Sequence, residues 1–437
     1  MPVNGRWLPR SCDGHRDLSE CVVMTFGNSC WPPTDFVIGH VTAVLPHRVV
    51  DNARVVVREG RIAEVGPHPP GAGCTLDAHG AHLLPGLVDV HTDILARETR
   101  PRPGVVLDPA FALMSAGGHL RAAGITTAFH GLAFQERSIV GTTIGSPAAP
   151  ELSDSLRHAD DTQVDHQVLH RLDARCEYGR TLLATELAAF DDSADSETRR
   201  SITTPNDPPH ARVPIVSHED HTPGQGQFAD PTTMQRWLIT NEGMAEAAAV
   251  DHVDRWRCTR AERLAVRDRT LTWLGDLART GHIRLFGHDL ATPDDVAAAA
   301  DRGCTVAEFP TTLDAARAAR DRGMLVVAGA PNVVRGGSHT GNVSAAELVV
   351  AGVADSLASD YLPSSMLPAA VRLVRDGVLS LPHAVRLITS GPAACVGLND
   401  RGVLTEGFRA DLVLTDLSKT WPVAHVISTQ SHTAARE

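Results

Sequence analysis

A regular alternation of short apolar runs with amphipathic helical stretches restricts the fold of this chain more than any other feature. The runs include GLVDVHTD, AGITTAFHG, VPIVSHEDH, HIRLFGHD and CTVAEFP, and each ends in polar residues. Most are followed by Ala-, Leu- and Arg-rich sequence such as PDDVAAAADRG. Repeated units of this kind predict an α/β fold, a (β/α)8 TIM-like barrel whose parallel strands are surrounded by helices.

The two ends of the chain predict a second, smaller domain. FVIGHVTAVL and ARVVVREGRIAEVG near the start, and RGVLTEGFRADLVLTD near the end, are β-branched runs broken by Gly. We therefore expect a small β-sandwich domain from residues 36–84 plus 395–437, and the barrel from residues 85–394. Residues 1–35 form an N-terminal extension of uncertain order, and the polar, proline-containing stretch 191–212 predicts a mobile loop.

Composition restricts the partners and the compartment. The formal net charge of -12 opposes binding to nucleic acid but leaves an anionic small molecule as a substrate. The eight cysteines are scattered without a CxxC pair, which is typical of reduced thiols. No stretch approaches the ~18 apolar residues of a membrane span, so we expect no membrane partner and a cytoplasmic location. The sequence leaves open whether the chain forms a homo-oligomer.

The lysine content restricts any metal bridge. Lys419 is the only lysine in the chain and lies close to the C-terminus. A carboxylated lysine therefore cannot join two metal ions inside the barrel. Any bridge there must come from a carboxylate or from water.

The segment LPGLVDVHTD gives the first indication of a metal site. Residues i and i+2 of a strand point to the same side, so His91 and Asp93 should converge at the C-terminal mouth of the barrel. An imidazole and a carboxylate together suit a divalent cation. The alternative is that the two side chains only cap the strand end.

Other predicted strands also end in metal-binding residue types. Buried together, such groups would cost much desolvation free energy unless positive charge neutralised them, and a pair of metal ions would do so. The residues at these ends are Glu177, His218, His221, His288, Asp289 and Asp360. Strand alternation places His218 and His221 on opposite faces, so only one of them should face the metals.

The ordered series HLLPGLVDVHTD, PRPGV, AGITT, ARCE, EDHTPGQGQF, GHD, VAEFPTT, AGAPNVVRGGSHTGN and ASDYLPSS resembles the phosphonate-metabolism diphosphatases (PhnM) of the amidohydrolase superfamily. The similarity extends from Phe36 to Leu417. The resemblance implies a metal-dependent hydrolase of the carbon–phosphorus lyase pathway. Its reaction would convert α-D-ribose 1-methylphosphonate 5-triphosphate, or a related phosphorylated sugar, to the 5-phosphate and pyrophosphate.

The resemblance also implies a centre of two divalent ions. By position, His91 and Asp93 would hold one ion, Glu177 would bridge, and His221 and His288 would hold the second. Zinc is the expected metal, and manganese, iron or nickel would suit the same donors.

Further residues are implied for proton transfer and phosphate binding. Asp360 would bind metal and, as the catalytic residue, take the proton from the attacking water. Because the barrel contains no lysine, metal ions and arginines would have to neutralise the phosphate charge. For each arginine, the alternative is an ordinary salt bridge. The phosphate-binding candidates are Arg102, Arg335, the backbone of Gly336, Gly337 and Ser338, and His339.

Several positions depart from the family pattern near the expected site. The departures are Ile94, Ala116, Gly117, His130 and Leu290. They remove polar groups that could orient a ribose or a phosphonate, so the exact substrate stays open. An alternative function keeps the metal centre but cleaves an amide, a cyclic amide or a lactone. A noncatalytic binding protein is a further alternative, opposed by the intact set of candidate ligands.

Overall fold

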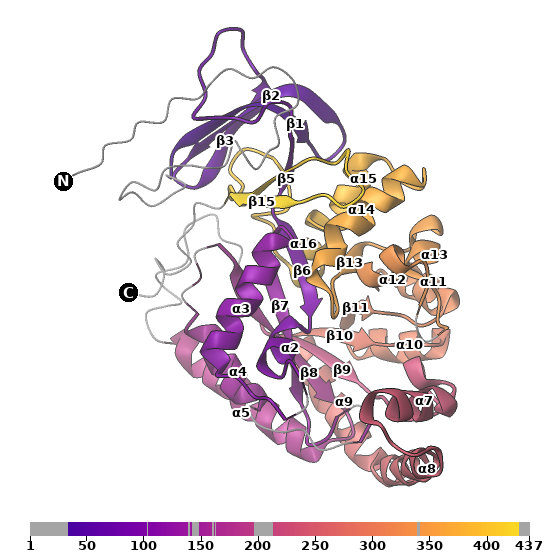
Figure 1. Cartoon of the computed structure of the whole chain (residues 1–437). Coiled ribbons are helices and arrows are strands. Elements are labelled where there is room, and N and C mark those ends of the chain that lie inside the picture. The colour runs from indigo at the N-terminus through magenta and orange to yellow at the C-terminus, as the bar shows by residue number, and fades with distance from the viewer. Residues whose placement is uncertain are drawn as a thin grey trace, which may run out of the picture.

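The computed structural model describes residues 34–102, 104–138, 140–141, 148–159, 161, 163–195, 213–338 and 341–427. Figure 1 shows two parts, a small sheet at one end of the molecule and a larger barrel below it.

Eight parallel strands form the barrel, and they lie side by side in the order in which they occur along the chain. They are β6 (Leu87–Thr92), β7 (Ile125–Phe134), β8 (Asp165–Asp173), β9 (Ile215–Glu219), β10 (Arg284–His288), β11 (Cys304–Glu308), β12 (Leu325–Gly329) and β13 (Ser356–Ala358). Because the carboxyl ends of parallel strands meet at one rim, the polar strand ends are brought together there. The predicted barrel is confirmed.

The last and first strands nearly close the barrel. The Asp360 N–H donates to the His91 carbonyl at 2.9 Å, and the Asp93 N–H donates to the Asp360 carbonyl at 2.7 Å. Thr92 and Asp360 also pair as a parallel bridge. These backbone bonds fix the HTD segment against the end of the chain's last barrel strand.

The interior of the barrel is filled by one apolar side chain from each strand. Two residues of α16 (Ser390–Val396), Cys395 and Val396, pack in the same cluster. The eight interior residues are Val90, Phe129, Leu169, Ile215, Phe286, Val306, Val327 and Ala358. The barrel is therefore a packed core, and its chemistry is restricted to the rim.

Helices cover the outside of the barrel (Figure 1). Their starts follow local sequence: in α10, the Thr292 side chain accepts from the Asp295 N–H and Asp295 caps in return, with Pro293 in the first turn. The helices are α2 (Ile94–Thr99), α3 (Pro109–Ala122), α4 (Ala149–Arg157), α5 (Glu177–Asp195), α7 (Pro231–Glu242), α8 (Glu246–Glu262), α9 (Leu264–Arg279), α10 (Pro293–Asp301), α11 (Leu313–Asp321), α12 (Ala330–Arg335), α13 (Ala345–Val350), α14 (Met366–Arg375), α15 (Leu381–Arg386) and α16 (Ser390–Val396). Single 3-10 turns occur at Gly226–Phe228 and Pro363–Ser365.

Segments from near both ends of the chain build the small domain, as predicted, and its seven strands are joined in one sheet. Strand β14 (Leu412–Thr415) pairs antiparallel with β5 (His82–Pro85), and β15 (Ala424–Ile427) pairs with β14. The C-terminal strands therefore extend a sheet begun by the N-terminal ones. A separate hydrophobic core lies within this sheet domain. Its strands are β1 (Phe36–Val44), β2 (Val49–Arg58), β3 (Arg61–Pro67), β4 (Leu76–Asp77), β5 (His82–Pro85), β14 (Leu412–Thr415) and β15 (Ala424–Ile427).

Some predicted boundaries need correction. The sequence predicts that Cys395 begins the C-terminal part of the small domain, but Cys395 belongs to α16 and packs with the interior residues of the barrel. The expected mobile loop starts too early, since α5 continues through Asp195. The rest of that loop, residues 196–212, and residues 1–33 of the N-terminal extension lie outside the described part of the chain.

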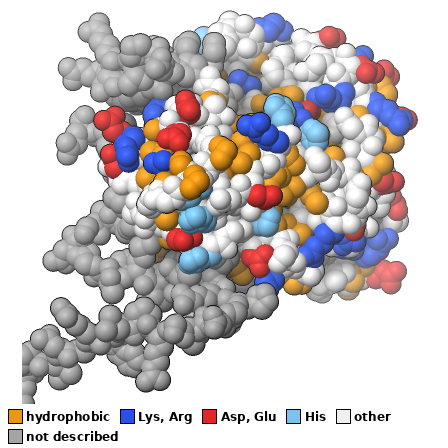
Figure 2. Space-filling view, turned by 90° about the horizontal axis from the view of Figure 1, so that it is seen from above, with side chains coloured by type: hydrophobic (Ala, Val, Ile, Leu, Met, Phe, Trp, Pro, Cys, Tyr) orange, Lys and Arg blue, Asp and Glu red, His pale blue; other side chains and the backbone are white. Residues whose placement is uncertain are grey.

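Charges of both signs are interspersed on the face that carries the small sheet (Figure 2). Hydrophobic side chains lie between them on the same face. Mixed charge of this kind does not produce the single-sign field that attracts a polyanion. Within the described residues, every helix is too short or too polar to cross a bilayer.

Candidate metal centre

The first group of candidate ligands joins the two strands that close the barrel. His91 is the fifth residue of β6, Asp93 follows that strand, and Asp360 follows β13. His91 Nε2 lies 3.6 Å from Asp93 Oδ1, and one donor atom from each of the three residues lies within 4.8 Å of the others. The structure therefore brings together the predicted pair and the predicted Asp360.

A second group lies at the ends of β9 and β10. Glu219, His221 and His288 each offer a donor atom within 4.8 Å of the others. Asp289 faces the same group, with Oδ2 at 3.2 Å from His221 Nε2 and 3.5 Å from His288 Nε2. Asp289 has a φ of 53°, and Asp360 has a φ of 54°, so both aspartates turn out of their strands through the left-handed region.

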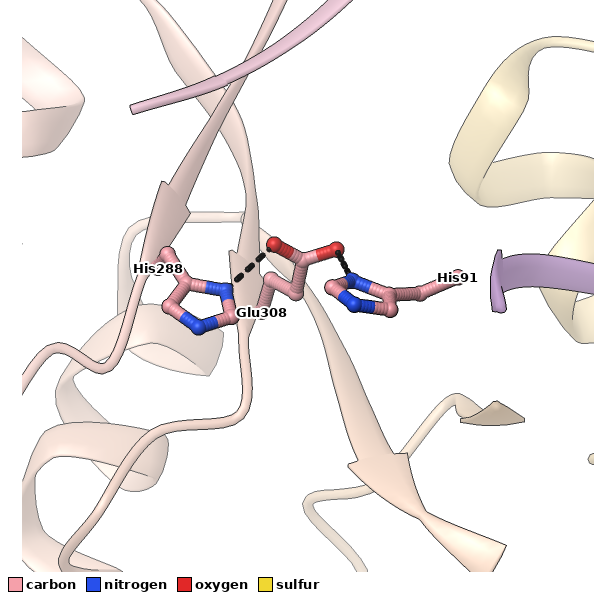
Figure 3. Close-up of side chains that lie close together, drawn as sticks. All are labelled: His91, His288 and Glu308. Atoms are coloured by element: carbon pink, nitrogen blue, oxygen red, sulfur yellow. Dashed lines mark hydrogen bonds and ion pairs between the residues drawn. The ribbon is translucent and has the colours of Figure 1, made fainter. Parts of the chain in front are cut away.

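Glu308 lies between the two groups, and with His91 and His288 it forms a third set of donor atoms within 4.8 Å of one another. Its Oε1 lies 2.8 Å from His91 Nδ1, and its Oε2 lies 2.7 Å from His288 Nδ1 (Figure 3). The carboxylate is fully buried, and Ser217 donates a further hydrogen bond to Oε2 at 2.5 Å. Glu308 therefore restrains both imidazole rings through the same atom, Nδ1.

Arg171 of β8 connects the two groups through their carboxylates. Its Nη1 donates to Asp93 Oδ1 at 3.0 Å, and its Nη2 donates to Glu219 Oε2 at 2.9 Å. Although burial opposes ionisation, Arg171 and His221 lower the pKa of Glu219 to about 2. Both carboxylates are thus held ionised and oriented.

The arrangement leaves buried polar atoms that fit a cation. Glu219 Oε1, His221 Nε2 and Asp289 Oδ2 have no hydrogen-bond partner among the described residues. Such atoms are costly to bury unsatisfied, and imidazole nitrogen and carboxylate oxygen are suitable ligands for a divalent metal. These residues can therefore hold a divalent metal ion.

The pKa of His91 also indicates that the carboxylates around it favour a positive charge at this site. Burial by itself would lower the pKa of His91, but Glu308 and Asp93 together raise that pKa to about 10. At Asp360, burial and the neighbouring Asp93 raise the pKa to about 6. A cation among these donors would take the place of the protons that the carboxylates otherwise attract.

Glu177, the predicted bridge, lies outside both groups. It is the first residue of α5, and its side chain is 47% exposed. Its carboxylate pairs with Arg180 in the next turn of the helix and with Arg269 of α9. The prediction of Glu177 as a bridging ligand is wrong in this structure, because β8 ends at Asp173 and α5 begins at Glu177 itself.

Sequence reasoning missed four residues of the site. Glu219 and Glu308 are the last residues of their strands, so the rule of polar strand ends could have selected them. Asp289 also lies at the end of a predicted strand, but neither spacing nor resemblance assigns it a role. Arg171 lies inside β8 and carried no comparable signal, since a single arginine in a strand does not indicate where its guanidinium reaches.

The expected phosphate-binding turn is occupied by helix capping. The N–H groups of Gly336 and Gly337 both donate to the Asn332 carbonyl at 3.0 Å, and Gly336 has a φ of 88° at the end of α12. These two amides end the helix and are not free for phosphate, which corrects the prediction. Ser338 follows them, and His339 lies outside the described residues.

Of the two predicted arginines, Arg335 lies near the rim. Burial and Asp360 raise the pKa of Tyr361, and Arg335 and Arg97 oppose that increase. Arg335 is the last residue of α12, which directly follows the carboxyl end of β12. Arg102 is exposed, and its part in phosphate binding stays a prediction.

One departure from the family pattern belongs to a buried polar chain. His130 Nε2 lies 2.9 Å from His166 Nδ1, and His166 Nε2 lies 3.3 Å from Asp161 Oδ2. Arg121 donates to the same aspartate oxygen at 2.6 Å. A Cβ atom at Gly117 would lie only 2.6 Å from that oxygen, so the glycine makes room for the chain.

The other departures are packing residues. Ile94, Ala116 and Leu290 are buried in the hydrophobic cluster between the barrel and its helices. His218, which strand alternation turned away from the metals, lies 3.6 Å from the Cys304 sulfur and belongs to neither ligand group. Burial lowers the pKa of His218 to about 4, as expected for a neutral core histidine.

A network of buried charges attaches α8 to the rim. Arg260 pairs with Asp173 at the end of β8 and donates to Asp220 Oδ1 at 2.7 Å. Arg175 donates to the other oxygen of Asp220 at 2.8 Å. Because Asp220 directly precedes His221, this network also restrains one candidate metal ligand.

The barrel and its rim of histidines and carboxylates define a class of metal-binding hydrolase, and a profile of the amidohydrolase family matches residues 237–434. The chain belongs to the amidohydrolase family. It is 35% identical over 389 residues to alpha-D-ribose 1-methylphosphonate 5-triphosphate diphosphatase of Escherichia coli (strain K12), an alignment that covers 86% of this chain and 94% of that enzyme.

More distant proteins are also similar. Imidazolonepropionase of Salinispora arenicola (strain CNS-205) is 28% identical over 386 residues, covering 84% of this chain and 86% of that protein. N-acetyl-D-glucosamine-6-phosphate deacetylase from Mycobacterium smegmatis, solved in complex with N-acetyl-D-glucosamine-6-phosphate, matches with a TM-score of 0.55 at 16% identity over 91% of this chain and 99% of its own. Atrazine chlorohydrolase from Arthrobacter aurescens TC1, complexed with zinc, matches with a TM-score of 0.54 at 15% identity over 88% and 87%. The structural matches concern the fold.

Proposed function

We propose that this protein hydrolyses α-D-ribose 1-methylphosphonate 5-triphosphate to the 5-phosphate and pyrophosphate in phosphonate catabolism. The observation that carries the proposal is the 35% identity to the diphosphatase of that substrate, which extends over 94% of that enzyme. The two ligand groups at the barrel rim support it, because phosphoryl transfer depends on positive charge placed around the attacked phosphorus.

We propose two divalent ions, one in each ligand group. The first group is His91, Asp93 and Asp360, and the second is Glu219, His221 and His288. The groups share no residue, and Arg171 and Glu308 each contact both. Zinc is the proposed metal, with manganese, iron or nickel as alternatives for the same donors. Divalent ions here would lower the pKa of a water and neutralise charge on the phosphoryl oxygens.

The side chains would then have separate tasks. Asp360 would accept the proton of the attacking water, because its carboxylate lies at the rim beside Asp93 and His91. Arg335 is the proposed contact for the leaving pyrophosphate, since it ends α12, the helix that directly follows barrel strand β12. Arg171 would keep two ligand carboxylates in place during the reaction.

Variants at the two glutamates separate the family-based and the structure-based ligand sets. Glu219→Gln is expected to weaken metal binding by at least about tenfold, because it removes a charged donor of the second group. Glu177→Gln is expected to leave metal binding unchanged, because that carboxylate faces solvent. Metal titration of both purified variants checks this, and an equal loss in Glu177→Gln would restore Glu177 as a ligand.

The test of the reaction follows pyrophosphate. Protein reconstituted with zinc or manganese is incubated with the ribose phosphonate triphosphate, and release of pyrophosphate and of the 5-phosphate is quantified. Equal amounts of both products are expected. Inert protein with two ions bound would reject the proposed substrate while leaving the metal centre intact.

The alternative function is cleavage of an amide, a cyclic amide or a lactone at the same centre. The similarity to imidazolonepropionase favours this reading, although at lower identity than the diphosphatase. A panel of such substrates, run with the same reconstituted protein, separates the two. Turnover of a cyclic amide without pyrophosphate release would favour the alternative.

We also propose that the enzyme is cytoplasmic and acts on an anionic small molecule. Its oligomeric state is left open between a single chain and a homo-oligomer. The cysteines Cys74, Cys176, Cys258, Cys304 and Cys395 are unpaired, as in a reducing compartment. Light scattering of the purified protein decides the oligomeric state.

A further inference from the structure

Glu308 makes the same kind of contact with one histidine from each ligand group. Figure 3 shows its carboxylate between His91 and His288, with one oxygen directed to the Nδ1 atom of each ring. These residues come from β6, β10 and β11, so the contact joins strands on different sides of the rim. No other described residue contacts both imidazoles in this way.

An ionised carboxylate can only accept hydrogen bonds. Both Nδ1 atoms must therefore carry hydrogen, and both Nε2 atoms are left with a free lone pair when the rings are neutral. His91 Nε2 is directed to the first group, 3.6 Å from Asp93 Oδ1. His288 Nε2 is directed to the second group, 3.5 Å from Asp289 Oδ2.

We propose that Glu308 is a positioning residue that sets one tautomer in both histidines and thereby prepares both ion positions at once. The inference rests on the proposed two-ion centre and concerns how the chain builds it. Glu308 is not itself a ligand in this view, because its oxygens are already used by two imidazoles and by Ser217.

Because of the Ser217 contact, a substitution at Glu308 should affect the hydrogen bonds of His91 and His288 differently. Oε2 accepts from both His288 and Ser217, whereas Oε1 accepts from His91 alone. In Glu308→Gln, the amide oxygen is expected to take the place of Oε2, where it can accept hydrogen bonds from both His288 and Ser217. The amide nitrogen then faces His91 Nδ1, and two N–H groups cannot point at one another.

His91 would therefore change tautomer in Glu308→Gln, so that Nδ1 accepts and Nε2 carries the hydrogen. A protonated Nε2 cannot bind metal, and the ion of the first group should be lost. The His288 side of the centre keeps its acceptor and should keep its ion. Metal content measured by mass spectrometry is expected to fall from about two ions per chain to about one.

A matched control and a double variant identify the ion that is lost. Ser217→Ala removes one donor to Glu308 but leaves both imidazole contacts, so it should retain both ions. Adding Glu219→Gln to Glu308→Gln should remove the remaining ion, whereas adding Asp93→Asn should remove nothing further. Glu308→Gln with both ions retained, or with none, would overturn the proposal.

A spectroscopic measurement on the unaltered holoenzyme tests the same idea without any variant. Long-range nitrogen–proton spectra of histidine-labelled protein should report hydrogen on Nδ1 and metal on Nε2 for both His91 and His288. Hydrogen on Nε2 of either ring would overturn the assignment. Neither the metal content nor the tautomer depends on the substrate, so failure of the proposed reaction would leave these readings unchanged.

Discussion

Asp360→Asn is expected to reduce the rate of pyrophosphate release by about 10²–10⁴-fold, the usual effect of removing a positioned general base. Asparagine has the same shape but cannot accept the proton of the attacking water. The backbone should be preserved, because asparagine tolerates the left-handed conformation that Asp360 adopts at a φ of 54°. Steady-state kinetics on metal-loaded protein measure the effect.

Two further measurements decide what the loss means. The backbone bonds of Asp360 to His91 and Asp93 do not involve its side chain, so the thermal stability of the variant should be close to that of the unaltered protein. Glu177→Gln is the matched control, a change from carboxylate to amide at an acidic residue outside the two ligand groups, and it should retain full activity. Near-normal turnover in Asp360→Asn would contradict the role of this residue in proton transfer.

Arg260→Leu is expected to lower the free energy of unfolding by about 3–5 kcal/mol. The guanidinium is 2% exposed and satisfies both Asp173 and Asp220, so its removal leaves buried carboxylates without their main partner. Part of the loss would come from α8, which this arginine attaches to the barrel rim. Urea denaturation followed by circular dichroism gives the change in midpoint.

The control lies on the same helix. Arg255 forms an exposed pair with Asp251, and Arg255→Leu should change stability by no more than about 0.5 kcal/mol. Combining Arg260→Leu with Asp173→Asn and Asp220→Asn should recover part of the lost stability, because the unpaired charges are removed. Equal stability of the two single arginine variants would show that the buried network contributes little.

The effect of Arg260→Leu should also depend on pH. Burial opposes ionisation of Asp220, but Arg260 and Arg175 hold its pKa well below the ordinary value. A depressed folded-state pKa gives stability that is present above the unfolded pKa and is lost as the pH falls. The difference between unaltered protein and variant should therefore be largest near neutral pH and should shrink below about pH 4.

Much of the architecture followed from local pattern. Alternating apolar runs and Ala-rich amphipathic stretches predicted the barrel, because strands and helices each impose their own spacing of apolar residues along the sequence. The spacing of His91 and Asp93 placed both at one rim, because alternate residues of a strand share a side. The absence of lysine in the barrel required that any bridging donor be a carboxylate or water.

The identity of the carboxylates at the centre was decided by tertiary structure. Glu177 was selected from sequence, yet the chain enters α5 at that residue and its side chain pairs with Arg180. Glu219 instead ends β9 inside the rim. Glu177 is excluded because β8 ends four residues before it, at Asp173, whereas Glu219 is the last residue of the next strand. Strand ends are the least certain part of a sequence-based prediction, and they decide which glutamate faces the centre.

Contacts across the barrel could not be predicted from local sequence pattern either. Glu308 and His91 are separated by 217 residues and meet only because eight strands curve round a common axis. Arg171 reaches Asp93 and Glu219 for the same reason. The sequence by itself determined the barrel and the rim that carries the chemistry, because both depend on periodicity. Only the tertiary structure decided which side chains meet there, because closure of the barrel sets distances that no short segment contains.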